Sequence, residues 1–318
     1  MTPLNFILKA MAGLAILLVL MISLTVTLTW APDKPVEELV NRWALPPSTF
    51  VDVKGLKVHV RDEGPRNDTA PIVLIHGTSS SLHTWEGWVA ALKGHRRVIT
   101  MDLPGFGLTG PNARDDYSSA VYTQFVLDLL DTLGVKRCVL GGNSLGGDIA
   151  WQVAAAAPTR VERLILVDAG GYPLHAQSMP IIFRIAKTPV LNLMILYTQP
   201  RSIVESSVRN VYGDPSRVTP QLVDRYDQLT LRQGNRRALL RRIRQTDFGA
   251  RASLIKTLKQ PTLILWGGRD KLIPPDDARR FQRDIANSRL VIFDDLGHVP
   301  QEEDPARTAA AVLAFLKR

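Results

Sequence analysis

The sequence has few features that would tie it to a metal, a redox cofactor or a disulfide framework. Its single cysteine, Cys138, excludes an internal disulfide bond. It contains no cluster with metal-ligand spacing, no glycine-rich dinucleotide fingerprint, no internal repeat and no low-complexity segment. Cys138 lies in an apolar stretch, and we interpret it as a buried core residue. We therefore expect a protein that uses neither a metal nor a cofactor.

Charge is absent from the amino-terminal segment. Residues 10–30 contain no charged side chain and are rich in Leu, Ile, Val and Met. As a helix this segment would be about 31 Å long, which matches a hydrocarbon core of about 30 Å. We therefore predict a membrane anchor over residues 1–30, followed by a tether over residues 31–49.

The charges around this segment predict its orientation. Lys9 and the amino terminus precede it, whereas acidic and basic residues are mixed after it, which favours a cytoplasmic amino terminus and an exported, periplasmic or extracellular, catalytic domain. A cleaved signal peptide is one alternative, but it would need a shorter apolar region and a small-x-small site, which residues 27–31 match poorly. A buried helix at the terminus is the other alternative.

The chain after residue 50 alternates short apolar runs with helical patterns. A hairpin is expected over residues 50–60, with its turn at Lys54-Gly55. Further strands are predicted at 72–75, 98–101, 138–140, 164–167, 262–265 and 290–293. Helices are predicted at 118–133, 144–156, 276–285 and 305–316. This alternation predicts an α/β fold, with a mainly parallel eight-stranded sheet covered by helices on both faces. The core would comprise residues 50–171 and 256–318.

Residues 172–255 interrupt the alternation with helix-like sequence, and we predict that they form an inserted helical lid. Between residues 172 and 250 there are twelve Arg or Lys and five Asp or Glu, a net +7 of the formal +9 of the chain. This charge indicates a solvated helical face, or a basic surface that meets anionic lipid headgroups or an acidic substrate. No nucleic-acid recognition motif accompanies it, so no nucleic-acid partner is expected. Apolar stretches at 179–183 and 190–197 could line an acyl pocket or pack against the core.

A serine lies between a predicted strand and a predicted helix. It is Ser144, in Gly142-Asn143-Ser144-Leu145-Gly146. The glycines would allow a strained turn and a close backbone approach there. The arrangement predicts a nucleophilic serine.

Two polar residues follow the last two predicted strands and complete a catalytic set. Serine needs a neighbouring imidazole as base, and a carboxylate on the other ring nitrogen fixes the tautomer and stabilises the imidazolium. We assign these roles to His298 and Asp270. Asp168, which follows the strand at 164–167, is the alternative acid. The backbone N–H groups of Leu145 and Thr78 are the candidate donors to a developing oxyanion.

Together these segments resemble the α/β-hydrolase superfamily. The matching motifs, in chain order, are His76-Gly77-Thr78, Asp102-Leu103-Pro104-Gly105-Phe106-Gly107, Gly142-Asn143-Ser144-Leu145-Gly146-Gly147, Gly267-Gly268-Arg269-Asp270 and Gly297-His298. They span nearly everything after residue 50. The order serine, aspartate, histidine is also that of this fold. The resemblance implies a hydrolase with a Ser144–Asp270–His298 triad.

Departures from particular branches narrow the chemistry that the resemblance implies. Epoxide hydrolases and haloalkane dehalogenases use an aspartate where this chain has Ser144, which argues against both. Residues 142–147 are similar to the Gly-Asn-Ser-Met-Gly-Gly of carbon–carbon bond hydrolases of ring-fission products. Those enzymes usually also carry Gly-Pro-Gly after the His-Gly turn and tryptophan after the catalytic histidine, where this chain has Thr-Ser-Ser-Ser at 78–81 and Val299-Pro300. The His-Gly-Gly-Gly turn of hormone-sensitive-lipase-like enzymes is absent.

We therefore expect a membrane-anchored, esterase- or lipase-like serine hydrolase that cleaves an ester or thioester of a hydrophobic small molecule through an acyl-enzyme. Carbon–carbon bond hydrolysis of a ring-fission product is the alternative. A non-catalytic binding module is a third possibility, although such modules commonly lose a triad residue and this chain has all three. No pattern specifies an oligomeric state.

Overall fold

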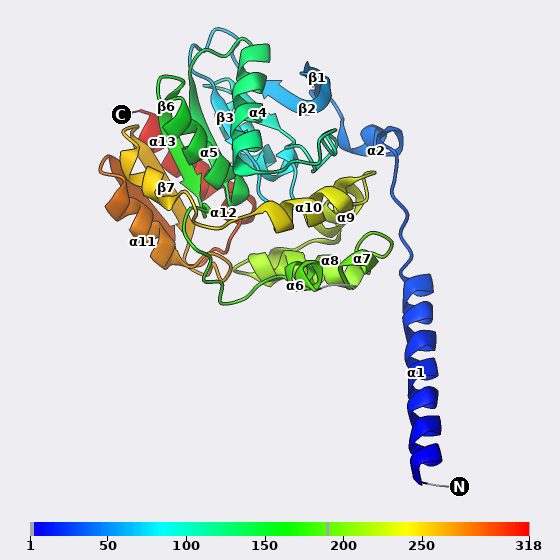
Figure 1. The fold of residues 1–318 in the computed structure, drawn as a ribbon. Coiled ribbons are helices and arrows are strands. Elements are labelled where there is room, and N and C mark those ends of the chain that lie inside the picture. Colours follow the sequence, from blue (N-terminus) through cyan, green and yellow to red (C-terminus); the bar gives the residue numbers. More distant parts are fainter. Residues whose placement is uncertain (1–2, 189–190, 318) are drawn as a thin grey trace.

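An eight-stranded sheet forms the centre of the protein in the computed structural model (Figure 1). The structure describes residues 3–188 and 191–317, so residues 1–2, 189–190 and 318 of the predicted anchor, lid and core lie outside it. The strand order is β1-β2-β4-β3-β5-β6-β7-β8, with antiparallel pairs at β1–β2 and β2–β4 and parallel pairs elsewhere. The strands are β1 (Thr49–Val53), β2 (Leu56–Glu63), β3 (Ile72–Ile75), β4 (Val98–Met101), β5 (Cys138–Asn143), β6 (Val161–Val167), β7 (Thr262–Gly267) and β8 (Ser288–Phe293). The predicted fold class and hairpin are confirmed.

Helices cover both faces of the sheet. One face packs against η1 (Leu82–Trp85), α3 (Glu86–Leu92) and α13 (Pro305–Leu316), and the other packs against α4 (Ser119–Thr132), α5 (Leu145–Ala156) and α11 (Pro275–Asp284). Trp85 and Trp88 are fully buried in the first of these layers, and the Trp88 indole N–H donates to Thr308 Oγ1 at 2.8 Å. These tryptophans therefore belong to the core.

The central strands are buried along their whole length, which explains their continuous apolar runs. β5 extends to Asn143, three residues beyond the predicted end, and remains paired with β6 to that point. Glycine is depleted in strands, so Gly141 and Gly142 do not indicate a strand in the sequence. Here they allow the sheet to continue up to Ser144.

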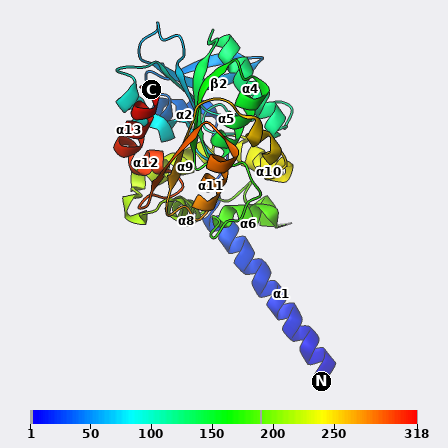
Figure 2. The same cartoon turned by 90° about the vertical axis from the view of Figure 1, so that its left-hand side faces the viewer.

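In the described part of the chain, five α-helices lie between β6 and β7, where the lid was predicted. They are α6 (Ile181–Lys187), α7 (Leu191–Met194), α8 (Arg201–Val211), α9 (Pro220–Thr230) and α10 (Asn235–Gln245). We call the segment between β6 and β7 that contains these helices the helical insertion. α6, α7 and α8 lie on the side of the molecule from which the amino-terminal helix projects (Figures 1 and 2).

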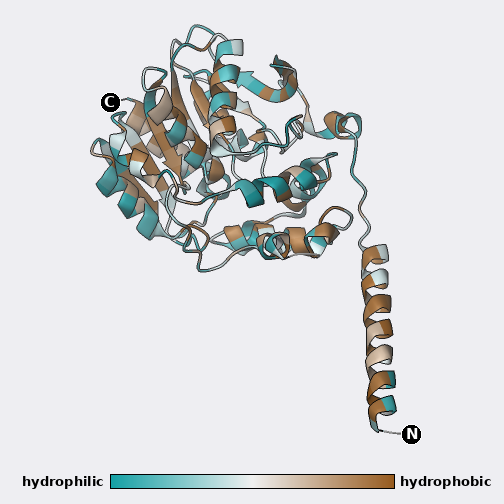
Figure 3. Ribbon diagram, viewed as in Figure 1, coloured by the Kyte–Doolittle hydropathy of each residue, from teal (hydrophilic) through white to brown (hydrophobic). Residues whose placement is uncertain are grey.

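The amino-terminal helix α1 (Pro3–Leu28) extends away from the rest of the protein in both views (Figures 1 and 2). It is apolar along most of its length (Figure 3), none of its most apolar stretch is buried, and it is long enough to cross a membrane.

The segment after α1 differs from an extended tether, because it contains a helix and is docked on the insertion. Helix α2 (Val36–Trp43) buries Leu39 against residues of the core and of α9. The Ala31 N–H donates to the Tyr197 carbonyl at 2.9 Å, and the Lys34 N–H donates to the Leu231 carbonyl at 2.7 Å. These contacts fix the end of α1 to the helical insertion.

We predict that Gly146→Ala destabilises the protein strongly. A Cβ at Gly146 would lie 2.0 Å from the Ile75 carbonyl oxygen, a backbone atom that cannot rotate away. Overpacking of this kind costs about 1–3 kcal/mol or more of unfolding free energy. Denaturant unfolding would measure the loss, with Gly94→Ala as the control, because a Cβ there meets nothing within 4 Å. Equal stability of the two variants would contradict this account of the turn.

Candidate active site

Ser144 lies at a tight turn between β5 and α5. Its backbone has φ 55° and ψ −115°, a conformation that costs energy for a residue with a side chain. The Ser144 N–H donates to the Val167 carbonyl at 3.0 Å, and the Ser144 carbonyl accepts from the Asp148 N–H at 3.0 Å. A Cβ at Gly142 would lie 2.2 Å from the backbone of Gly146. The two glycines thus make the turn possible, and the turn presents the serine.

His298 and Asp270 are brought together from the ends of two adjacent strands. His298 Nδ1 lies 2.7 Å from Asp270 Oδ2, and both residues are buried. The other carboxylate oxygen of Asp270 accepts from the N–H groups of Leu272, at 2.8 Å, and Ile273, at 3.0 Å. With the Nδ1 proton directed at the carboxylate, Nε2 is the nitrogen left to act as a base.

Two residues that the sequence analysis did not assign hold the His298 loop. The Asn143 side-chain amide donates to the His298 carbonyl at 2.9 Å. A Glu303 carboxylate oxygen accepts from the Gly297 N–H at 2.6 Å. Asn143 stood in the serine motif, but the local sequence did not indicate its partner. Glu303 lies in α12 (Pro300–Glu303), and no motif marks it.

Asp168, the alternative acid, lies behind Asp270. It is fully buried, and its Oδ1 accepts from the Gly267 N–H at 2.9 Å. Burial, together with the neighbouring Asp270 carboxylate, raises the pKa of Asp168 well above its usual range. The raised pKa favours the protonated form of Asp168. The structure thus places both candidate acids at one site, and the carboxylate hydrogen-bonded to His298 is that of Asp270.

Asp168, Asp270 and His298 also form the group of potential metal ligands found among the described residues, with ligand atoms within 4.8 Å of one another. Two ligands about 2.1 Å from a tetrahedral zinc ion would lie about 3.4 Å apart. The separation of 2.7 Å between His298 Nδ1 and Asp270 Oδ2 is that of a hydrogen bond. The geometry fits a proton relay better than a shared metal ion.

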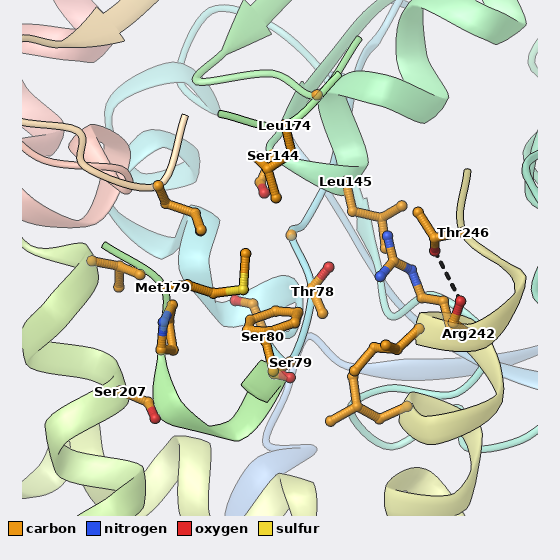
Figure 4. A pocket seen from close by; sticks show the side chains of 18 of the residues that line it. Thr78, Ser79, Ser80, Ser144, Leu145, Leu174, Met179, Ser207, Arg242 and Thr246 are labelled. Atoms are coloured by element: carbon orange, nitrogen blue, oxygen red, sulfur yellow. Dashed lines mark hydrogen bonds between the residues drawn. The ribbon is translucent and has the colours of Figure 1, made fainter. Parts of the chain in front are cut away.

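The two candidate oxyanion donors lie beside Ser144. Leu145 is the first residue of α5, and Thr78 follows β3 after the His76-Gly77 turn. Within the described part of the chain neither N–H group donates a hydrogen bond. Both residues line the same cavity as Ser144 (Figure 4). Two unpaired backbone donors next to a nucleophile can stabilise charge that develops on a substrate oxygen.

A cavity of about 510 Å³ contains Ser144 and His298 in its wall. Much of the remaining wall is apolar and comes from the helical insertion: Met179, Phe183, Met194, Ile195, Ile203 and Leu239. Residue 190 of the predicted apolar stretches lies outside the described residues. Thr25 and Thr29, at the carboxyl-terminal end of α1, also line the cavity. The candidate site is thus covered by the insertion and borders the amino-terminal helix.

The basic residues of the insertion do not form a simple solvated face. Arg236 is 2% exposed and pairs with Asp33 at 2.6 Å. Arg225 pairs with Glu302 at 2.9 Å. Arg242 is 5% exposed and lines the cavity. Part of the positive charge counted in the sequence therefore lies inside the protein.

Comparison with known proteins places this geometry in a family. The sequence pattern that defines the Alpha/beta hydrolase family matches residues 72–311. The chain belongs to this family. As a member of the α/β-hydrolase family it is a hydrolase, and the predicted resemblance is confirmed.

Relatives within the α/β-hydrolase family carry different names. An uncharacterized hydrolase, YugF, of Bacillus subtilis is 26% identical, over 86% of this chain and 99% of the relative. A 2-hydroxy-6-oxononadienedioate/2-hydroxy-6-oxononatrienedioate hydrolase of Burkholderia vietnamiensis is 30% identical, over 83% of this chain and 92% of the relative. The family is therefore shown, whereas the type of bond cleaved differs among relatives.

Solved structures show the same fold. The crystal structure of a membrane phospholipase A, described as a bacterial virulence factor, superposes with a TM-score of 0.74 at 23% identity and covers 98% of both chains. A meta-cleavage product hydrolase from Pseudomonas fluorescens IP01 gives a TM-score of 0.73 at 26% identity, over 85% of this chain and 97% of that one.

We predict that substituting Asp270 lowers the activity far more than substituting Asp168. Asp270→Asn should lower kcat/KM for a soluble 4-nitrophenyl ester by about 10⁴-fold, because an amide neither fixes the imidazole tautomer nor stabilises the imidazolium. Asp168→Asn should lower it by less than about tenfold, because an amide oxygen can still accept from the Gly267 N–H and Asp270 keeps its contact with the imidazole. The steady-state kinetics of both purified variants are the measurement. Similar losses in the two would refute Asp270 as the acid partner of His298.

Proposed function

We propose that the protein is a serine hydrolase that cleaves the ester, or thioester, of a hydrophobic substrate through an acyl-enzyme. One arrangement carries the proposal. Ser144, held in a strained strand-to-helix turn, shares an apolar cavity with His298, and the Nδ1 atom of His298 lies 2.7 Å from the buried carboxylate of Asp270.

Each step of this reaction has a candidate group. His298 Nε2 takes the proton of Ser144 as the hydroxyl oxygen attacks the carbonyl carbon. The N–H groups of Leu145 and Thr78 stabilise the negative oxygen of the tetrahedral intermediate. The imidazolium returns the proton to the leaving alcohol or thiol as its bond to carbon breaks. A water molecule then repeats the sequence on the acyl-serine and releases the acid.

A fluorophosphonate probe tests the nucleophile directly. The wild-type protein should be labelled, Ser144→Ala should not, and His298→Ala should be labelled far more slowly because Ser144 loses its base. Ser79→Ala, in the neighbouring turn, is the matched control and should be labelled as the wild type. Absence of labelling in a folded wild-type protein would leave the hydrolase fold with a binding role instead.

The type of bond is decided by a substrate panel. We expect 4-nitrophenyl esters of increasing acyl length to be hydrolysed with rising kcat/KM until the acyl chain fills the cavity. Relatives named as hydrolases of oxononadienedioates favour carbon–carbon cleavage as the second candidate. A ring-fission dienoate therefore belongs in the panel, and its faster turnover would replace the ester proposal.

We also propose that α1 anchors the protein in a membrane and that the substrate is a membrane lipid. Exposed apolar side chains lie on α6, on and beside α7, and just beyond α1, on the side of the molecule from which α1 projects: Trp30, Ile181, Leu191, Leu193 and Tyr197. Trp30 stacks on Tyr197 with ring centroids 5.8 Å apart. Tryptophan and tyrosine favour the membrane–water interface. Thr25 and Thr29 connect this side to the cavity. The name of the similar membrane phospholipase A supports a lipid ester as substrate.

We predict an exported catalytic domain, because Lys9 lies in the amino-terminal part of α1, just before the uncharged residues 10–30. In cells whose outer envelope has been opened while the cytoplasmic membrane stays closed, added protease should digest the part of the chain that follows α1. A cytoplasmic marker protein in the same cells should stay intact. Full protection of the domain would reverse the proposed topology, and a soluble released domain would indicate a cleaved signal peptide.

A further inference from the structure

Arg242 lies in the cavity wall, and no carboxylate of the described residues pairs with its guanidinium. It belongs to α10 and is 5% exposed. Its Nε is buried without a hydrogen-bond partner, and no carboxylate of the described residues lies within 4.0 Å of its guanidinium. Other arginines of the insertion are paired, for example Arg236 with Asp33 and Arg225 with Glu302. Arg232 also has a buried Nε without a partner, but it does not line the cavity, whereas Arg242 does.

The guanidinium lies near the turn that carries the nucleophile. Arg242 lines the cavity together with Ser144 and Leu145, and its side chain points toward Leu145 (Figure 4). Its charge acts on Asp148, whose N–H donates to the Ser144 carbonyl at 3.0 Å. A group bound to Arg242 would thus lie close to the scissile bond of a substrate on Ser144.

Asp148 forms no ion pair with this arginine within 4.0 Å, although its charge acts on the guanidinium. Its carboxylate accepts instead from the Gln152 side-chain amide at 2.9 Å, and burial raises the pKa of Asp148 to about 6. The Gln152 carbonyl in turn accepts from Arg251 at 3.2 Å. This part of the wall therefore carries two guanidinium groups, those of Arg242 and Arg251, beside the one carboxyl group of Asp148.

Burying a guanidinium without an acceptor is energetically costly, and desolvation lowers the pKa of Arg242. Arginine nevertheless stays charged in proteins. A planar guanidinium offers paired N–H donors that match the oxygens of a phosphate or a carboxylate. Such a ligand would supply the acceptors that the protein does not.

We propose that Arg242 is an anion-recognition residue, which binds a negatively charged group of the ester substrate a few bonds from the scissile carbonyl. This inference rests on the proposed function and specifies its substrate. The chemistry is that of an oxyanion, which a lipid phosphodiester or the carboxylate of an acidic ester can supply. The apolar cavity beside α1 favours the phosphodiester.

The test compares matched substrates on the full-length protein in detergent. The first pair is dihexanoyl phosphatidylglycerol and dihexanoylglycerol, which differ in the phosphodiester. The second pair is the 4-nitrophenyl monoester of adipic acid and 4-nitrophenyl hexanoate, which differ in the carboxylate. In Arg242→Gln the kcat/KM ratio of anionic to neutral substrate should fall by about 10- to 100-fold, because a buried charged hydrogen bond is lost.

Two further variants serve as controls. Arg241→Gln, which removes a half-exposed charge from the same helix, should keep the wild-type ratio. Arg242→Lys should retain part of the preference, because the charge remains and the paired donors do not. It also keeps the test possible if Arg242→Gln fails to fold. Inorganic phosphate, tested as an inhibitor of 4-nitrophenyl hexanoate hydrolysis, should inhibit the wild type more strongly than either Arg242 variant.

The pair whose ratio falls identifies the source of the oxyanion. Ratios unchanged in the Arg242 variants, for both pairs, would overturn the proposal even if the neutral esters are cleaved. Phosphate inhibition alone, without a change in either ratio, would show a site for free anions and would overturn it as well. Failure of the wild type to cleave any ester of the panel would instead refute the proposed function.

Discussion

The close backbone contact between β3 and the first turn of α5 is the constraint on which the site depends. Gly146 packs directly on the Ile75 carbonyl, and Gly142 packs on Gly146. This contact leaves Ser144 in a conformation that its side chain alone would disfavour. It also sets Leu145 and Thr78 beside the serine with unpaired N–H groups among the described residues. The candidate nucleophile and the two candidate donors are thus held in place by one backbone contact between two turns.

The sequence predicted what depends on local pattern. Apolar runs located the strands because parallel strands are buried on both faces. Polar residues in the turns and loops that follow three of those strands gave Ser144, Asp270 and His298. The structure adds partners that no local pattern contains. Asn143 reaches the His298 carbonyl across the fold, and Glu303 reaches the Gly297 N–H from the short helix that follows this loop. Asp168 meets Asp270 because β6 and β7 are neighbours.

Helices and charges show the same division. α3 is too short for a clear period, and α2 depends on burying Leu39 against residues far along the chain, so neither was predicted. The net charge of the insertion could be counted, but its distribution could not. Arg236 and Arg225 serve internal ion pairs, whereas Arg242 faces the cavity. Composition gives a sum of charges, and only the fold determines which of them a ligand can reach.

Backbone hydrogen bonds join the end of α1 directly to the insertion. The Gln199 N–H donates to the Thr29 carbonyl at 3.0 Å, and the Ala31 N–H donates to the Tyr197 carbonyl at 2.9 Å, directly at the end of the helix. With α1 inserted in a bilayer, the height of the catalytic chamber above the lipid surface would follow from how deeply one helix sits. Bilayer thickness and helix tilt would then influence the rate of catalysis, because the distance between the cavity and the lipids could not change independently of the position of α1.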